Sequence, residues 1–433
     1  MKSSYRRFLA VIAALVAGFG SLVVSGAETP YRLLKEIPVG GDGGWDYLSV
    51  DVAARRLYVS HGNKVIVVDL EKNEVAGEIA DTPGVHGLAV ASDLKRGFST
   101  NGRENKVNIV DLETLKTLSK VDTGANPDGM LYEPAKQEVY VFNGSGQSAT
   151  VIDAKAGKVV ATVPLGGKPE FAAADSKAGR VFNNLEDKSE VVAIDTKTHT
   201  VVNRWPIAPG EGASGMAFDA QNHRLFLGCG NKLMVMMDSA TGKVVATIPL
   251  GGKPEFATAD PKAGRVYNNI EDKSVVVVID TKTHQVVNTW PVAPGEEPSG
   301  MAIDATHHRL FLGCGNKLMI MMDSSNGQII ATVPIGDRVD GNAFDPVTRF
   351  AFSSNGDGTV TVAQEQTPDK LTVIQTLTTE RGARTMALDP KTHRIYLASA
   401  KYEAQPPAAE GAPRQRPKII PGSFKVLVYG MDK

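Results

Sequence analysis

Short runs of apolar residues, separated by polar turns, recur along most of the chain. Within one unit, four such runs of strand length follow one another at residues 215–219, 223–227, 233–237 and 243–248. No segment keeps the 3.6-residue period of an amphipathic helix, whereas regularly spaced short strands with turn signals are typical of all-β folds. The pattern therefore predicts a series of four-stranded units.

One polar position recurs nine times, each time at the start of a unit. Successive occurrences lie 40 to 44 residues apart, which is the length of one four-stranded propeller blade. Blades that stand around a common axis leave only short, protected strand edges. The nine residues are Asp46, His86, Asp128, Glu170, Ser214, Glu255, Ser299, Asp340 and Arg384. The period thus predicts an all-β protein, a β-propeller of nine four-stranded blades.

Residues 158–242 are repeated as residues 243–327, a shift of 85 positions at which about four residues in five are identical. Each copy is two units long, so a chain with a single copy would have seven units. We therefore interpret the chain as a seven-bladed propeller in which a two-blade segment is duplicated. Each added unit has two apolar faces to bury, which favours a wider ring over a looped-out pair.

The last unit lacks a fourth strand of its own after residues 424–429. Residues 31–39 precede the first unit and read as a strand. We expect this N-terminal strand to complete the last blade and close the ring.

The turns have a regular chemistry. An Asp between the third and fourth strands, usually followed by Gly, is typical of a hairpin in which the carboxylate accepts hydrogen bonds from the turn backbone. We predict this turn-forming role for Asp69, Asp111, Asp153, Asp195, Asp238, Asp280 and Asp323. Three further turns read Asp-x-x-x-His, and we expect the imidazoles of His223, His308 and His393 to bond within their own turns.

The N-terminus has the pattern of an export signal. Basic residues Lys2, Arg6 and Arg7 precede an apolar run, and small residues end it before Glu28. We predict a signal peptide at 1–27, cleaved to leave a single propeller domain at 28–433 in the periplasm or outside the cell, without stable membrane insertion. An uncleaved anchor is the alternative, although Gly18 and the short run make it marginal. Either the general or the twin-arginine export route is open.

Charge and cysteine content exclude some functions. A formal net charge of −1 gives no reason to expect nucleic acid as a partner. Cys229 and Cys314 occupy matching places two blades apart, on the order of 20 Å, which is too far for a disulfide. The methionines of the third strands, such as Met236, are predicted to fill the core rather than bind copper. We expect a monomer.

The repeats carry a family likeness. The motifs at 151–162, 215–219 and 223–228, together with 381–390 and 420–428 in the last unit, resemble the secreted bacterial YVTN-type propellers grouped as YncE-like proteins. The resemblance covers almost all of the chain after residue 27. It implies a periplasmic or extracellular propeller, usually of seven blades, and one branch of the family is associated with single-stranded DNA binding. It implies little about activity, because fold does not fix function.

The candidate ligand-binding face is the one on which the innermost strands begin. Five carboxylates converge there, and crowded carboxylates favour a hard cation with oxygen ligands. We predict an axial ligand-binding site formed by Asp46, His86, Asp128, Glu170, Glu255, Asp340 and Arg384, in which Asp128, Glu170 and Glu255 are the candidate ligands of Ca²⁺ or Mg²⁺. The alternative is a hydrated acidic channel mouth in which Arg384 pairs with Asp340 or Asp46.

Loops between second and third strands are expected to add a polar rim to this face. They include His61-Gly-Asn63, Asn101-Gly-Arg103, Asn143-Gly-Ser145, Asn183-Asn-Leu-Glu186, Asn268-Asn-Ile-Glu271 and Asn355-Gly-Asp357. A Pro-rich loop at 402–422 lands on the same face and is a candidate lid or docking arm.

The sequence therefore favours a secreted module that binds a small molecule or protein partner through its axial face. A metal-dependent, lactonase-like hydrolase is the alternative, since it would need such Asp, Glu and Asn residues to bind a cation and activate water. No recognisable pair of nucleophile and base supports an enzyme. Single-stranded DNA binding is the second alternative, against which the net charge argues.

Overall fold

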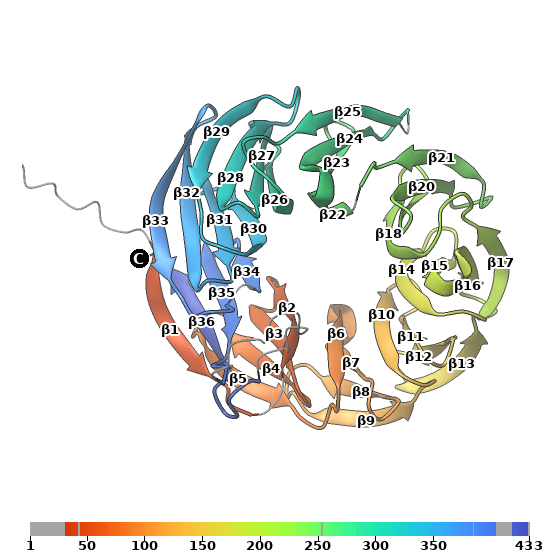
Figure 1. The fold of residues 1–433 in the computed structure, drawn as a ribbon. Helices are drawn as coiled ribbons and strands as arrows, with labels where there is room; N and C mark the ends of the chain where they lie inside the picture. Colours follow the sequence, from red (N-terminus) through yellow and green to blue (C-terminus); the bar gives the residue numbers. More distant parts are fainter. Residues whose placement is uncertain are drawn as a thin grey trace, which may run out of the picture.

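The computed structural model describes residues 31–41, 44–252, 254–283, 285–383, 385–403 and 418–431, without the side chains of Asp46 and Tyr47. Within these residues the chain forms nine four-stranded antiparallel sheets. The sheets stand in a ring like the blades of a propeller (Figure 1). The predicted all-β fold and the number of nine blades are therefore confirmed.

Blades 1 to 5 follow the chain, each running from an innermost to an outermost strand. Blade 1 contains β2 (Trp45–Asp51), β3 (Arg56–His61), β4 (Lys64–Asp69) and β5 (Glu74–Ile79); blade 2 contains β6 (Val85–Ala91), β7 (Arg96–Asn101), β8 (Lys106–Asp111) and β9 (Thr117–Asp122); blade 3 contains β10 (Pro127–Glu133), β11 (Glu138–Asn143), β12 (Ser148–Asp153) and β13 (Lys158–Pro164); blade 4 contains β14 (Pro169–Asp175), β15 (Arg180–Leu185), β16 (Glu190–Asp195) and β17 (Thr200–Pro206); blade 5 contains β18 (Ala213–Asp219), β19 (Arg224–Cys229), β20 (Leu233–Asp238) and β21 (Val244–Pro249).

Blades 6 to 9 continue the ring. Blade 6 contains β22 (Pro254–Asp260), β23 (Arg265–Ile270), β24 (Val275–Asp280) and β25 (Gln285–Pro291); blade 7 contains β26 (Pro298–Asp304), β27 (Arg309–Cys314), β28 (Leu318–Asp323) and β29 (Ile329–Pro334); blade 8 contains β30 (Val339–Asp345), β31 (Phe350–Asn355), β32 (Thr359–Thr367) and β33 (Lys370–Thr378); blade 9 contains β34 (Met386–Asp389), β35 (Arg394–Ser399), β36 (Lys425–Gly430) and β1 (Arg32–Pro38). Short 3₁₀ turns occur at η1 (Ser92–Leu94), η2 (Glu186–Lys188) and η3 (Glu271–Lys273).

The N-terminal strand closes the ring, as the sequence predicts. Strand β1 pairs antiparallel with β36, so that Arg32 lies opposite Gly430 and Pro38 opposite Lys425. A second link joins the same two blades, because the guanidinium of Arg55 in blade 1 donates to the buried carboxylate of Asp389 in blade 9 at 2.5 and 2.9 Å. Closure therefore combines backbone pairing with a partly buried ion pair.

The core lies between neighbouring blades rather than in one central mass. The second and third strands are buried on both faces, which explains their nearly continuous apolar sequences. Met236, Met237, Met321 and Met322 are fully buried in this core. The two cysteines are buried free thiols, so the predictions for methionine and cysteine are confirmed.

The turns between third and fourth strands have the predicted chemistry. Asp69 shows the pattern, because its Oδ1 accepts the backbone N–H groups of Glu71 and Lys72 at 2.8 and 2.9 Å. Equivalent bonds occur at Asp111, Asp153, Asp195, Asp238, Asp280 and Asp323. The recurring aspartates are therefore turn formers.

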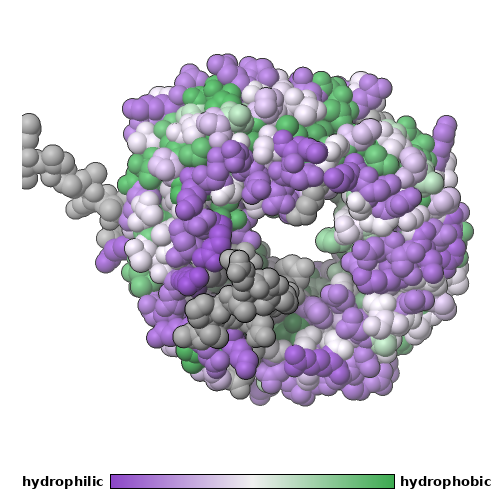
Figure 2. Space-filling model, in the orientation of Figure 1, coloured by the Kyte–Doolittle hydropathy of each residue, from purple (hydrophilic) through white to green (hydrophobic). Residues whose placement is uncertain are grey.

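The two faces of the ring differ in their loops. We call the face with the loops between second and third strands, such as residues 62–63, the upper face. The lower face carries the turns between innermost and second strands, such as residues 52–55. Figure 2 shows an opening through the middle of the ring with hydrophilic residues along much of its border. In the described part of the chain, helices are limited to three-residue turns, and none has the length or apolarity to cross a membrane.

The interface between blades 5 and 6 is less closely packed than the matching interface between blades 7 and 8. A methyl group placed on Gly313 would lie 2.5 Å from the side-chain amide of Asn342, whereas one on the matching Gly228 would meet nothing within 4 Å. Figure 1 shows β18 and β22 far apart. Blades 5 and 6 therefore contact each other mainly through their outer strands.

Candidate functional site

The predicted axial residues occupy one structural position. Each lies second in its innermost strand, and the register with the second strand shifts at or directly after it, as between Pro127 and Met130. Such a β-bulge re-aims side chains at the end of a strand. The residues in this position are Asp46, His86, Asp128, Glu170, Ser214, Glu255, Ser299 and Asp340. Arg384 and the side chain of Asp46 lie outside the described residues.

Neighbouring blades bring two of these residues together. The Nδ1 atom of His86 lies 3.7 Å from Oδ1 of Asp128, and both side chains are well exposed. In the next blade, Lys168 bridges Glu170 and Glu186 at 2.6 and 2.7 Å. These hydrogen bonds, first to Glu170 and then to Glu186, raise the pKa of Lys168. The carboxylate of Glu170 is thus already paired with a cation, which it shares with Glu186.

The remaining axial residues are spread around the ring. Glu255 and Asp340 are exposed at the starts of β22 and β30. Among the described residues, Asp128, Glu170 and Glu255 do not form a group of three ligand atoms within 4.8 Å. The Ca²⁺ or Mg²⁺ site therefore stays a prediction without an observed cluster.

The predicted polar rim is wrong for most of its asparagines. Asn184 lies within β15 and is fully buried; its Oδ1 accepts the N–H of Phe171 at 3.0 Å and its Nδ2 donates to the carbonyl of Ala213 in the next blade. Asn269 repeats these bonds with Phe256 and Pro298. Asn101, Asn143, Asn183 and Asn355 are also fully buried, and Asn268 is 5% exposed. Asn184 and Asn269 bind backbone groups of the bulge and of the next blade, and burial keeps all of these amides away from the surface where a hydrolase ligand would lie.

A cavity of about 610 Å³ opens on the upper face beside the ring closure. Loops of blades 1 and 2 and the segment that links β1 to β2 surround it. Its lining residues are Gly41, Gly44, Gly62, Asn63, Lys64, Glu78, Ala80, Asp81 and Arg103. The described end of the Pro-rich loop adjoins this segment, because the N–H of Gly422 donates to the carbonyl of Gly41 at 2.9 Å.

The cavity adjoins the His86–Asp128 pair. Gly102 and Arg103 form one turn, and a methyl group on Gly102 would lie 3.0 Å from Nε2 of His86. Inside the cavity, Lys64 pairs with Glu78 at 2.8 Å and Asp81 pairs with Lys120 at 2.7 Å. The exposed guanidinium of Arg103 has no ion pair within the described part of the chain. Cavity and axial pair therefore form one continuous polar surface.

Two of the three histidines that were expected to bond within their own turns, His223 and His393, instead face a carboxylate of the preceding blade. His393 Nδ1 lies 2.6 Å from Oδ2 of Asp345 in the preceding blade, and His223 Nδ1 lies 3.7 Å from Oδ2 of Asp175. The carboxylate within each turn accepts backbone N–H groups and turn side chains instead. The expectation failed because it ignored how closely the next blade approaches the end of each innermost strand.

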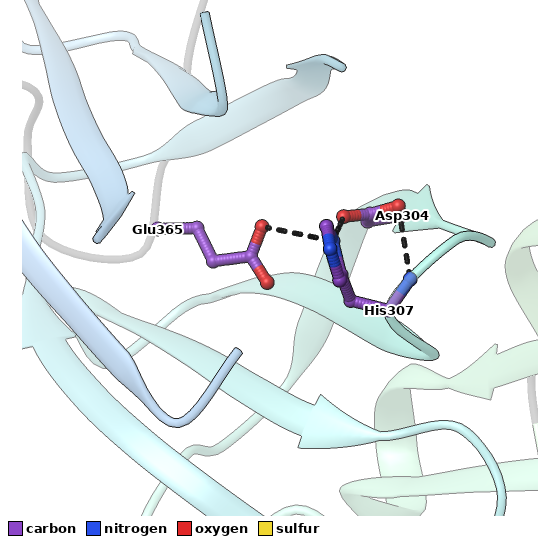
Figure 3. Close-up of side chains that lie close together, drawn as sticks. All are labelled: Asp304, His307 and Glu365. Carbon is purple, nitrogen blue, oxygen red and sulfur yellow. Dashed lines mark hydrogen bonds and ion pairs between the residues drawn. The ribbon is translucent and has the colours of Figure 1, made fainter. Parts of the chain in front are cut away.

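A second polar cluster, which the sequence did not reveal, lies on the lower face between blades 7 and 8. It consists of Asp304, His307 and Glu365, whose side chains point toward one another in Figure 3. Burial alone would raise the pKa of Asp304, but the hydrogen bond from His307 and those from the backbone N–H groups of Thr306 and His307 together lower it. Burial, followed by the charge of Asp304, raises the pKa of Glu365. Two carboxylates with opposite shifts thus share one imidazole.

Comparison with solved structures supports the fold alone. The chain is similar to the dihydro-heme d1 dehydrogenase NirN in complex with DHE, with a TM-score of 0.57, 15% identity, and coverage of 79% of this chain and 78% of that one. It is also similar to BamB from Moraxella catarrhalis, with a TM-score of 0.52 at 16% identity, covering 77% and 99%. The computationally designed Ika8 protein gives a TM-score of 0.54 at 14% identity, covering 75% and 98%. No protein-family model and no curated protein matches the sequence. The chain has the β-propeller fold.

Proposed function

We propose that this propeller is a secreted binding module whose ligand or partner occupies the upper face. The observation that carries the proposal is the cavity of about 610 Å³ beside the ring closure. Ligand sites are concave and contain a few convergent polar groups. Here the groups come from two blades and from the segment after β1, so a ligand would contact the part of the ring that closes last.

The charges favour a polar ligand with an anionic group. Lys64 and Lys120 are engaged by carboxylates, which leaves the guanidinium of Arg103 as the exposed cation at the cavity. A guanidinium binds carboxylate or phosphate through two parallel hydrogen bonds. His86 and Asn126 extend the same surface toward the axis, because both lie against Gly102.

The similar structures are compatible with this role. NirN, whose fold is similar, was solved in complex with DHE. The signal-like N-terminus supports export to the periplasm, and the YncE-like resemblance supports the same compartment. Export would be seen as a mature protein whose mass corresponds to a chain that starts at Glu28.

The experiment compares the two faces directly. A photo-crosslinking residue replaces Asn63 on the upper face or Lys155 on the lower face of the exported chain in intact cells. We expect adducts of defined mass from position 63 that Arg103→Glu reduces, and none from position 155. Equal labelling from both faces, or adducts from position 155 alone, would contradict the proposal.

A further inference from the structure

The Asp304–His307–Glu365 cluster joins three side chains from two blades. Asp304 ends the innermost strand of blade 7, His307 lies in the following turn, and Glu365 belongs to the third strand of blade 8. Nδ1 of His307 lies 2.6 Å from Oδ2 of Asp304 and 3.9 Å from Oε2 of Glu365 (Figure 3). One ligand atom from each residue falls within 4.8 Å of the others.

The position of Glu365 is unusual for a carboxylate. In eight blades, the residue that follows the last backbone pair between the second and third strands donates its N–H to a carbonyl in the turn between the first two strands. In blade 8 this residue is Glu365, which donates to the carbonyl of Arg349 at 3.0 Å. The other seven blades place uncharged residues there: Leu70, Leu112, Ala154, Thr196, Ser239, Thr281 and Ser324. The position is enclosed between blades, which suits an apolar or small side chain.

The Glu365 carboxylate is incompletely satisfied. Its side chain is fully buried, and Oε1 has no hydrogen-bond partner, while Oε2 accepts only a long bond of 3.4 Å from Nε of Arg349. Leaving a buried charged oxygen without a partner costs more than leaving a neutral one. An additional cation at this place would satisfy it.

The duplicated segment supplies an internal comparison. Asp219 in blade 5 matches Asp304, but Asn222 stands where blade 7 has His307, and its Nδ2 donates to the Asp219 carboxylate at 2.7 Å. The next blade has Thr281 where blade 8 has Glu365. Of these two matching interfaces, only the one between blades 7 and 8 therefore has both the imidazole and the second carboxylate.

We propose that Asp304, His307 and Glu365 bind a divalent first-row transition metal ion, such as Zn²⁺ or Mn²⁺. One imidazole nitrogen and two carboxylates form a mixed N and O ligand set, which such ions accept, whereas Ca²⁺ prefers oxygen ligands alone. The ion links blade 7 to blade 8. His307 remains 35% exposed, so water or a ligand group can reach the remaining coordination positions.

Metal binding must displace a proton and rearrange one contact. The ion replaces the proton that His307 shares with Asp304, so binding weakens as the pH falls. At metal–ligand bond lengths of about 2.0–2.2 Å, two ligand atoms of one ion lie roughly 3–4 Å apart. The distance of 2.6 Å between His307 and Asp304 therefore has to increase, whereas the distance of 3.9 Å between His307 and Glu365 is already within this range. Arg349 moves away from Glu365 toward solvent.

The test measures metal binding by the exported chain after chelator treatment. Isothermal titration with Zn²⁺ and with Mn²⁺ is expected to show one site per chain for at least one of the two ions, together with an upward shift of the melting temperature. His307→Asn and Glu365→Thr introduce the residues of the matching interface and should each abolish the site. Glu365→Gln keeps the side-chain shape and should also abolish it, and circular dichroism confirms that each variant is folded.

The matched control is His223→Asn, which removes a different imidazole that faces a carboxylate, Asp175. This control should retain the stoichiometric site. Absence of binding to the wild-type chain, or binding that His307→Asn and Glu365→Thr leave unchanged, would overturn the proposal. Cobalt substitution adds an independent readout, because the visible spectrum of bound Co²⁺ should disappear in both variants.

Discussion

Blades 5 and 7 have nearly the same sequence, yet they meet their following neighbours differently. Phe311 of blade 7 is fully buried and stacks on Phe344 of blade 8 with ring centroids 4.9 Å apart. The matching Phe226 of blade 5 is only partly buried. Ala302, in the same cluster between blades 7 and 8, is 9% exposed, whereas Ala217 in the matching position is exposed. Blade 8 therefore buries residues of blade 7 whose counterparts in blade 5 stay partly exposed next to blade 6.

The arrangement of the copies explains this difference. The interface between blades 4 and 5 lies within the first copy, and the equivalent interface between blades 6 and 7 lies within the second. In a chain with one copy, blade 5 would pack on blade 8, as blade 7 does here. Only the interface between blades 5 and 6 joins two surfaces that a seven-bladed chain would never bring together. Tight packing requires complementary shapes, so this interface is less complete than the one between blades 7 and 8.

The largest effect is expected from removing the second copy. Deletion of residues 243–327 joins Gly242 to Gln328 within equivalent hairpins and lets blade 5 pack directly on blade 8. We expect a closed seven-bladed ring with one cooperative unfolding transition and a smaller radius of gyration by X-ray scattering. Metal binding should be lost, because Asn222 then faces Glu365. Aggregation or two separate transitions would contradict this interpretation of the duplication.

The second prediction compares the two phenylalanines. Phe311→Ala should lower the free energy of unfolding by about 3–5 kcal/mol, because it leaves a cavity in a closely packed interface. Phe226→Ala should cost about 1–2 kcal/mol, because part of that ring already contacts water. Urea denaturation of the two variants measures both. Equal losses would show that the two interfaces are equally packed.

A third prediction tests whether the contacts inside each copy are equivalent. Asn184→Ala and Asn269→Ala each leave a buried bulge N–H and a carbonyl of the next blade without a partner. We expect each to cost about 2–3 kcal/mol, with a difference of about 0.5 kcal/mol or less between them. A clear difference in denaturation midpoint would mean that packing differs within the copies as well as between them.

The smallest effect concerns Glu365 in the metal-free protein. Burial, followed by the charge of Asp304, raises the pKa of Glu365. The protonated side chain therefore stabilises the fold below the ordinary pKa of a glutamate. This stabilisation is lost as the pH rises through the raised pKa. With chelator present, Glu365→Thr should therefore match the wild type near pH 3 and exceed it by about 1 kcal/mol at neutral pH. Denaturation midpoints across this range measure the difference. A constant offset at all pH values would exclude ionisation as the cause.

The repeat period was sufficient to predict the nine blades, their strand order and the closing strand, because each blade is specified by local turn chemistry and apolar runs. Asp69 and its equivalents show why: their hydrogen bonds stay within a few residues. In blades 1 to 8 the recurring polar residue lies second in the innermost strand, at the start of the unit where the repeat period placed it, and its ligand-binding role stays a prediction.

Contacts between blades were not predictable in this way. His393 bonds to Asp345, 48 residues earlier, and Glu365 approaches His307 across an interface. One sequence signal was available for Glu365, namely a carboxylate in a place where seven other blades have uncharged residues. The asparagines were misassigned to loops because Asn-Gly pairs are typical of turns, whereas bulge backbone in a propeller needs buried amide partners.

The pairing of β1 with β36 has a consequence for biogenesis. During synthesis β1 emerges before the other strands, whereas its partner β36 is the last strand to emerge. Until then blade 9 is incomplete and an unsaturated sheet edge is accessible to other chains. A chaperone that shields this edge, or a circular permutant that starts within another blade, should therefore change the yield of folded protein more than its final stability.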